Sequence, residues 1–269
     1  MASDYSNYKN LLISRQNTIL TVALNRPAQF NAIDHDLHEE LDDIFYDIAK
    51  DDGIDVVVLT GEGKAFCAGG DLRAMKKHAD ASGKPGHYLS RVTAKRIVYT
   101  LLDLEKPVVA KVNGPAIGLG ATLALLCDII YMADDAVIAD PHVKAGVVAG
   151  DGGAIIWPQL VGYARAKEFL MTGDAITARD AHRMGLVNHV VARVSLDAEV
   201  QKMAHRLATG PRDAIRWSKV CANIGLRQLA HSILDASLAY ETLTLHSATH
   251  KEAIDAFAER RDPDFSPKG

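Results

Sequence analysis

The chain has 269 residues, of which 48% are hydrophobic and 24% charged, and its formal net charge is −4. These values are typical of a globular protein with enough apolar material for a sizeable core. A slightly acidic balance provides no global positive field for nucleic acid or anionic lipid. We therefore expect neither of them as a partner.

The cysteines and the apolar runs indicate in which cellular compartment the protein is expected. Cys67, Cys127 and Cys221 are far apart and form no C-x-x-C pair, which indicates neither a disulfide framework nor a zinc motif. The first residues are polar and contain no apolar segment of a signal peptide. No apolar run approaches the roughly 18 residues of a membrane span. We expect a cytoplasmic protein with no membrane segment and no bound metal.

The first part of the chain alternates between strand and helix patterns. Residues 19–24 are an apolar run that predicts a buried strand, and Asp34 is a suitable N-cap for the amphipathic helix that follows. The pattern then predicts, in order, a strand at 55–60, a helix from about Leu72, an exposed Gly- and Pro-containing loop at 78–90, a helix at 91–105 and a strand at 108–112. Such alternation is typical of an α/β arrangement built from βαβ units.

The last third of the chain contains no strand pattern. Helical periodicity is found at 196–208, 212–224, 227–246 and 248–261. We therefore predict two parts, an α/β core over residues 1–195 and an all-helical C-terminal region over residues 196–269.

Two segments, residues 64–71 and 111–122, look alike in their local pattern. Each contains a turn of small residues that follows a β-type run and precedes a helical pattern. Such a turn lets a ligand approach the main chain closely, and a helix N-terminus favours negative charge. We expect two backbone N–H groups here that receive a thioester oxygen.

These turns and their neighbours resemble the crotonase, or enoyl-CoA hydratase/isomerase, superfamily. The similarity covers nearly the whole chain, through residues 24–33, 57–61, 65–71, 106–114, 127–130, 170–181 and 185–188. It implies the ClpP-like crotonase fold, a spiral of ββα units with a helical C-terminal trimerisation region. It also implies a homotrimer or hexamer, in which an apolar stripe of that region needs a partner subunit: Leu229, Ile233, Leu234, Leu238 and Leu245.

The resemblance also implies the substrate and the residues around it. The substrate is an acyl-CoA thioester, coenzyme A enters as part of that substrate, and no other cofactor is needed. The oxyanion donors are the N–H groups of Gly70 and Leu119. The contacts to substrate and coenzyme A are assigned to Arg26, Ala28, Phe30, Ala68, Gly70, Asp71 and Thr122.

The acid–base positions depart from the family pattern. A typical hydratase of the family uses two glutamates, and the matching positions in this chain are Thr122 and His142. A threonine hydroxyl can position water but cannot deprotonate it near neutral pH. We therefore expect only weak hydration of crotonyl-CoA.

His142 and Asp151 are similar to a histidine–aspartate pair in the β-diketone hydrolases, the retro-Claisen branch of the superfamily. A histidine titrates near pH 6.5, and a nearby carboxylate fixes its tautomer. The alternative is that His142 is a pocket wall and Asp151 a helix cap, because Asp-Gly-Gly suits an N-cap. In that case His87 and Tyr88 are the next candidates for the base.

Three functions remain open at this point. The first is an enoyl-CoA hydratase/isomerase-type enzyme, a lyase or isomerase of fatty acid metabolism, that acts through a stabilised enolate without the two usual glutamates. The second is a C–C bond hydrolase of a β-dicarbonyl substrate that uses His142 and Asp151. The third is a non-catalytic acyl-CoA-binding member of the family.

Overall fold

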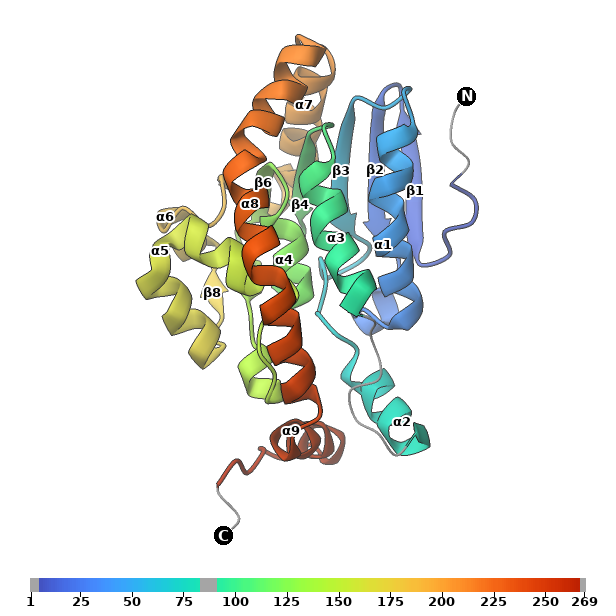
Figure 1. The fold of residues 1–269 in the computed structure, drawn as a ribbon. Coiled ribbons are helices and arrows are strands. Elements are labelled where there is room, and N and C mark those ends of the chain that lie inside the picture. The colour runs from blue at the N-terminus through green and yellow to red at the C-terminus, as the bar shows by residue number, and fades with distance from the viewer. Residues whose placement is uncertain (1–4, 83–90, 267–269) are drawn as a thin grey trace.

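The computed structural model describes residues 5–82 and 91–266, and Figure 1 shows their arrangement. The candidates His87 and Tyr88 lie outside the described residues. No helix within the described ranges has the length and apolar character needed to cross a membrane.

The main sheet has six strands in the order β1-β2-β3-β4-β6-β9. The bounds are β1 (Leu11–Gln16), β2 (Ile19–Leu24), β3 (Val56–Gly61), β4 (Val108–Val112), β6 (Ile129–Ala133) and β9 (His189–Val191). β1 and β2 form an antiparallel pair, and every later pairing in this sheet is parallel. All six residues of β3 are buried, as expected for a strand covered on both faces.

Helices cover the sheet. α1 (His35–Lys50) and α3 (Arg91–Asp103) pack against each other in front of the strands in Figure 1, and α7 (Leu196–Ala208) contacts β3 and β4. α1 begins as predicted, because the Asp34 side chain accepts a hydrogen bond from the N–H of Leu37 at 3.0 Å. A second sheet of three strands has the order β5-β7-β8, with bounds β5 (Ala116–Ile117), β7 (Val137–Ala139) and β8 (Ile176–Thr177).

The remaining elements connect these sheets to the C-terminus. They are the short 3-10 segments η1 (Pro27–Gln29), η2 (His142–Ala145) and η3 (Arg193–Ser195), and the helices α2 (Leu72–Ser82), α4 (Leu119–Leu125), α5 (Gly153–Thr172) and α6 (Ala178–Arg183). The loop predicted from residue 78 is wrong for residues 78–82, which belong to α2. The side chain of Asp71 accepts hydrogen bonds from the N–H groups of Arg73 and Ala74, which initiates this helix.

The C-terminal region is helical as predicted, but its two middle segments are one helix. α8 (Arg212–Leu245) runs for 34 residues without a break at Gly225. A glycine in a helix interior costs only about 1 kcal/mol, which packing along the rest of α8 outweighs. In Figure 1, α8 crosses the molecule from α7 down to α9 (Ala248–Glu259), which lies at the same end as α2.

Part of the apolar stripe of α8 is buried within this single chain. Leu234 and Leu238 are 0% and 3% exposed in the single chain, and Leu229 and Ile233 pack partly buried against the same core. Leu245 lines a cavity of this chain. Leu234 and Leu238 therefore do not need a neighbouring subunit for their burial, because α8 folds back over its own core. The trimer stays a prediction.

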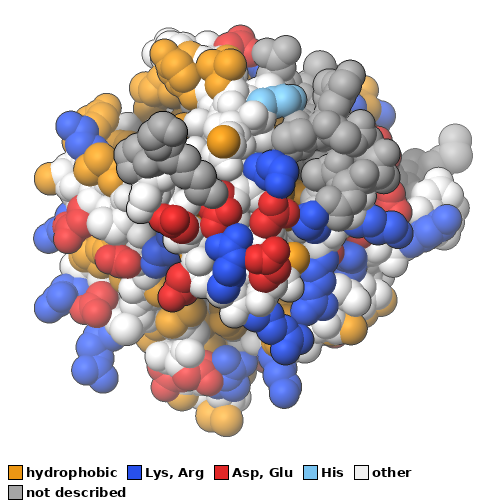
Figure 2. All heavy atoms as spheres, turned by 90° about the horizontal axis from the view of Figure 1, so that it is seen from below, with side chains coloured by type: hydrophobic (Ala, Val, Ile, Leu, Met, Phe, Trp, Pro, Cys, Tyr) orange, Lys and Arg blue, Asp and Glu red, His pale blue; other side chains and the backbone are white. Residues whose placement is uncertain are grey.

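The surface around α9 is charged and mixed in sign. Figure 2, which views this end from below, shows acidic and basic side chains side by side. Ion pairs account for several of them, among them Lys76 with Asp255 at 3.3 Å and Lys251 with Asp255 at 2.6 Å. The Lys76 pair joins α2 to α9, and both helices also contribute residues to the cavity described below.

Candidate active site

The two small-residue turns predicted from the sequence lie against each other. The N–H of Cys67 donates to the Pro115 carbonyl at 3.0 Å, and the N–H of Ile117 donates to the Cys67 carbonyl at 2.9 Å. Gly69 has φ +81°, and a Cβ atom there would lie 2.8 Å from the Ile117 carbonyl oxygen. Only glycine allows this close approach of the two backbones, so the contact explains a glycine at position 69.

A buried asparagine holds the first turn in place. The Asn31 amide nitrogen donates to the carbonyls of Glu62 and Ala65 at 2.9 Å, and its oxygen accepts from the N–H of Arg26 at 2.9 Å. The Phe30 carbonyl accepts from the N–H of Ala68 at 3.0 Å. These bonds fix the main chain just before Gly70.

Gly70 and Leu119 are brought to one cavity, as predicted. Both residues line it, and neither backbone N–H has a hydrogen-bond partner within residues 5–82 and 91–266. Leu119 is the first residue of α4, where an N–H has no acceptor within the helix. Two unpaired N–H groups facing one cavity can bind the oxygen of a developing enolate.

His142 lies beside the second turn. A Cβ atom on Gly118 would lie 3.4 Å from His142 Cε1, so the imidazole packs against the residue that precedes Leu119. His142 Nδ1 is 2.5 Å from Asp140 Oδ1, and its Nε2 is 3.4 Å from Asp151 Oδ2. One imidazole is therefore held between two carboxylates.

Asp151 faces His142 and is not the N-cap residue of α5, although the backbone N–H of Gly153, the first residue of that helix, helps to lower its pKa. The N-cap of α5 is Gly152, and that helix has no side-chain cap. Asp151 is 6% exposed, and its second oxygen, Oδ1, has no hydrogen-bond partner in the described chain. The geometry thus favours a role for Asp151 toward His142 over the capping alternative.

The carboxylates control the charge of the pair. Burial by itself lowers the pKa of His142, but the charges of Asp140 and Asp151 and their hydrogen bonds outweigh it and hold this pKa well above 6.5. Burial would raise the pKa of Asp151, and the charge of His142 lowers it below its usual value. The pair therefore shares a proton at neutral pH, with the imidazole as its main carrier.

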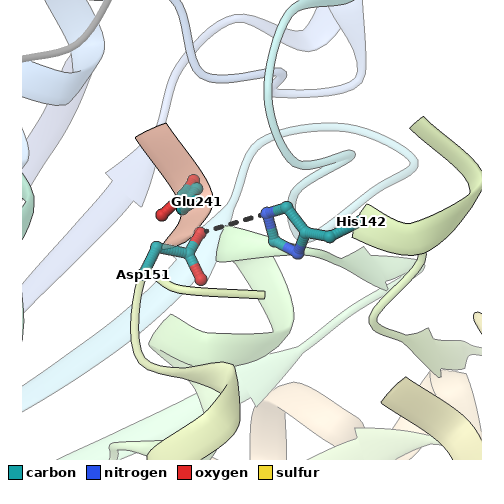
Figure 3. Close-up of side chains that lie close together, drawn as sticks. All are labelled: His142, Asp151 and Glu241. Atoms are coloured by element: carbon teal, nitrogen blue, oxygen red, sulfur yellow. Dashed lines mark ion pairs between the residues drawn. The ribbon is translucent and has the colours of Figure 1, made fainter. Parts of the chain in front are cut away.

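The structure adds two residues that the sequence reasoning missed. Asp140 comes two positions before His142, and its proximity in sequence was the one available signal. Glu241 comes from α8, ninety residues after Asp151, and no local pattern pointed to it. Figure 3 shows Glu241 and Asp151 side by side, with the His142 ring facing them.

Glu241 is positioned by the contact between α8 and Gly150. Ser237 Oγ donates to the Gly150 carbonyl at 2.8 Å, and a Cβ atom on Gly150 would lie 2.4 Å from the Ser237 carbonyl and 2.6 Å from Glu241 Cβ. The missing side chain at position 150 therefore lets α8 approach the loop that carries Asp151. Burial and the nearby carboxylate of Asp151 raise the pKa of Glu241 to about 8, so its protonated form is well populated at neutral pH.

The cavity has a volume of about 360 Å³, in the range of small-molecule sites. Its polar end carries His142, Asp151 and Glu241, next to the Gly70 and Leu119 donors. The rest is mainly apolar and is lined in part by the C-terminal segment of the same chain: Leu245, His250, Ala253, Ile254 and Phe257. This shape fits an acyl group whose reactive carbons lie at the polar end.

The predicted coenzyme A contacts are only partly brought to this cavity. Ala68 and Gly70 line it, whereas Arg26, Ala28, Phe30, Asp71 and Thr122 do not. Arg26 pairs with Asp34 at 2.7 Å and with Asp71 at 3.3 Å, so two carboxylates already occupy the guanidinium group that the resemblance assigned to substrate and coenzyme A.

Two more of these positions differ in their exposure. Phe30 is 55% exposed and free to contact a ligand outside the cavity. Thr122 is fully buried inside α4, and its hydroxyl has no partner within the described ranges. The structure therefore does not present Thr122 to a substrate.

Comparison with known proteins identifies the family. The enoyl-CoA hydratase/isomerase family pattern matches residues 14–268. The chain is 33% identical to the crotonyl-CoA hydratase of Syntrophomonas wolfei over 97% of this chain and 99% of that protein. It is also 33% identical to the 1,2-epoxyphenylacetyl-CoA isomerase of Escherichia coli, over 93% and 95% of the two chains.

Solved structures agree with this relationship. The crystal structure of an enoyl-CoA hydratase/isomerase from Mycobacterium paratuberculosis superposes with a TM-score of 0.83 at 33% identity, over 91% of this chain and 97% of that one. An enoyl-CoA hydratase from Mycobacterium avium subsp. paratuberculosis K-10 gives 0.86 at 26% identity, over 96% and 99%. The chain described here belongs to the enoyl-CoA hydratase/isomerase, or crotonase, family of lyases and isomerases.

Proposed function

We propose that this protein is an enzyme that acts on an acyl-CoA-type thioester through an enolate, with His142 as its acid–base group. The observation that carries the proposal is the placement of His142 against Gly118, next to the unpaired N–H groups of Gly70 and Leu119. An enolate oxygen bound by the two N–H groups places the reacting carbons beside the imidazole. One oxyanion donor is worth about 2.7–4 kcal/mol in comparable sites.

The acid–base machinery supports a mechanism other than the two-glutamate hydration of the family. Thr122 is buried and does not face the cavity, and His142 stands at the other glutamate position of the resemblance. Glu241, which enters from α8, lies at a different place in the chain and lines the same cavity as His142. We therefore propose that hydration of crotonyl-CoA is slow in this protein.

A second candidate reaction is the hydrolysis of a C–C bond in a β-dicarbonyl substrate. The observation that favours it is the pairing of His142 with Asp140 and Asp151, which suits activation of water. The neutral form of His142 takes a proton from water while the water oxygen attacks the distal carbonyl carbon. The bond between that carbon and Cα breaks, and its electron pair forms the enolate bound by Gly70 and Leu119. His142 then returns the proton to Cα, which yields a carboxylic acid and the shortened thioester or ketone.

Glu241 has a place in this scheme as a proton donor. Its carboxyl group lies near Asp151 in the cavity, and its pKa of about 8 leaves it mainly protonated at pH 7. A neutral carboxyl group can donate a hydrogen bond to the attacked carbonyl and stabilise its developing negative charge. Asp140 fixes the orientation of His142 through Nδ1 and is a positioning residue.

The experiment that separates these reactions is a mass-spectrometric assay of the purified protein with crotonyl-CoA, β-ketoacyl-CoA thioesters and cyclic 1,3-diketones. Gain of water without bond cleavage indicates hydration. Gain of water with chain or ring cleavage indicates C–C hydrolysis. Tight binding of acyl-CoA without any turnover across the panel would support the non-catalytic alternative and overturn the proposal.

A further inference from the structure

We propose that His142, Asp151 and Glu241 form a binding site for a divalent transition-metal ion, with Zn²⁺ as the best match, and that the bound ion inhibits the enzyme. The site itself is inferred from geometry alone, and only its inhibitory effect rests on the proposed function. The sequence shows no zinc motif because the three ligands come from three separate segments: η2, the loop before α5, and α8.

The spacing of the ligand atoms fits such an ion. The three residues each offer one atom, and these atoms all lie within 4.8 Å of one another. His142 Nε2 and Asp151 Oδ2 are 3.4 Å apart, and two ligands about 2.0–2.1 Å from a tetrahedral zinc ion lie roughly 3.3–3.4 Å apart. Glu241 has a flexible side chain and needs only a small movement to complete the triangle seen in Figure 3.

The imidazole is oriented for a metal by a second carboxylate. Asp140 Oδ1 lies 2.5 Å from His142 Nδ1, and Asp140 is fully buried. A carboxylate that accepts the proton of one ring nitrogen makes the other nitrogen the one that binds a metal, which displaces the proton held there, and this arrangement is found in most histidine metal ligands. Nε2 is the nitrogen that faces Asp151 and Glu241.

The excess of carboxyl groups in the cluster also favours the binding of a cation. Three carboxyl groups surround one imidazole, and the lysine and arginine that line the cavity, Lys144 and Arg261, point to other partners. Lys144 pairs with Asp174 at 3.3 Å, and Arg261 pairs with Glu252 and Glu259. Asp151 is more than nine-tenths buried and has one oxygen without a partner in the described chain. Bound protons partly balance this charge in the metal-free protein, and a divalent ion balances it more completely.

The donor set selects the metal. One imidazole nitrogen and two carboxylate oxygens suit Zn²⁺, Co²⁺ or Mn²⁺, whereas Mg²⁺ prefers an octahedral set of oxygens and keeps most of its water. Three protein ligands leave one tetrahedral position for water or another small ligand. Since the ion occupies Nε2, His142 can no longer carry a proton to or from the substrate, and we expect inhibition.

The test is a calorimetric titration of tag-free, chelator-treated full-length protein with ZnCl₂ and, separately, MgCl₂. We expect one zinc ion per chain and no comparable binding of Mg²⁺. Asp140→Asn should weaken zinc binding about 10–100-fold, the usual effect of changing the partner of a histidine ligand. Asp151→Asn and Glu241→Gln remove direct ligands and should weaken it more. Circular dichroism of each variant checks that the fold is kept.

A matched control comes from an exposed histidine–glutamate pair on α1. His35 Nε2 and Glu39 Oε1 are 3.3 Å apart, so Glu39→Gln tests for nonspecific surface binding and should leave the titration unchanged. Co²⁺ bound at the cavity should give the strong visible absorption of a tetrahedral ion, and Asp151→Asn should abolish it.

The outcomes separate the site from the proposed reaction. Binding that survives in folded Asp151→Asn and Glu241→Gln proteins, or that disappears with Glu39→Gln, overturns the metal site whatever the activity. Turnover is measured with zinc bound and again after EDTA removes it. If the two rates are equal although zinc binds at the cluster, the inhibitory effect is overturned. If the native protein binds no metal but turns over its substrate normally, the metal site is contradicted and the proposed function is unaffected.

Discussion

The two halves of the cavity are built in different ways. One half consists of main-chain N–H groups from two adjacent turns, at Gly70 and Leu119. The other half consists of side chains from distant segments, with His142 on η2, Asp151 before α5 and Glu241 on α8. The first half depends on glycines that let two backbones touch, and the second depends on how a 34-residue helix docks.

This difference explains how one fold can support different reactions. A backbone donor does not change when its side chain is replaced, so the half proposed to bind the enolate is insensitive to most substitutions. The acid–base half changes with single substitutions, and here it holds a histidine and acidic residues. Variants aimed at each half should therefore behave differently.

The largest effect is expected at the side-chain half. His142→Ala and Asp151→Asn should each reduce kcat by about 10²–10⁴-fold, the range for loss of general acid–base assistance, while ligand affinity changes little. Their losses should be non-additive because one residue acts through the other. A double-mutant cycle on kcat/KM measures this, with the exposed His205→Ala in α7 as control. Near-native rates in both single variants would make the pair structural.

In the backbone half, a single substitution can remove one N–H donor. Leu119 is the first residue of α4, a position where proline is tolerated in helices, so Leu119→Pro removes the N–H donor while α4 persists. We expect kcat to fall about 10²–10³-fold. Leu119→Met keeps the donor and a similar volume, so its kcat should stay near native. Equal losses in the two variants would show that the side chain and not the N–H carries the effect.

An effect of intermediate size, on the free energy of unfolding, is expected where α8 docks. Gly150→Ala places a methyl group against the Ser237 carbonyl and Glu241 Cβ, and such overpacking costs about 1–3 kcal/mol. Gly225→Ala is the matched control, because a Cβ atom there meets nothing within 4 Å and should stabilise α8 by about 0.5–1 kcal/mol. Urea denaturation measures both. Destabilisation by the control, or none by Gly150→Ala, would contradict the packing argument.

The smallest effect is expected at Glu241. Glu241→Gln replaces the carboxyl O–H donor with a weaker amide N–H donor, so we expect a loss of at most about 1 kcal/mol, or roughly fivefold in kcat near pH 7. The protonated acid is present below its pKa of about 8 and is lost above it, so native activity should fall as pH rises through 8. The variant should lack this alkaline decline. The pH–rate profiles are to be measured with EDTA present and with exposed Glu168→Gln as control; an unchanged decline in Glu241→Gln would assign it to another group.

Much of the architecture was readable from local patterns. The apolar runs of β2, β3 and β4 and the Asp34 cap of α1 gave these elements nearly at their observed bounds. The oxyanion turns were predicted because small residues between a strand and a helix form a local signal. His142 and Asp151 were predicted because they lie nine positions apart in a family-like segment.

The remaining features depend on contacts between distant parts of the chain. The sequence determined three central strands, the helical C-terminal region, the family and the two small-residue turns, because each is encoded in neighbouring residues. Only the tertiary structure decided that α8 is continuous and folds over its own core, which brings Glu241 beside Asp151 and lines the cavity with C-terminal residues of the same chain. It also paired Arg26 with two carboxylates and buried Thr122 outside the lining of the cavity. The physical reason is that helix docking depends on the fit between surfaces far apart in sequence, such as Gly150 against Ser237, and no local periodicity records that fit.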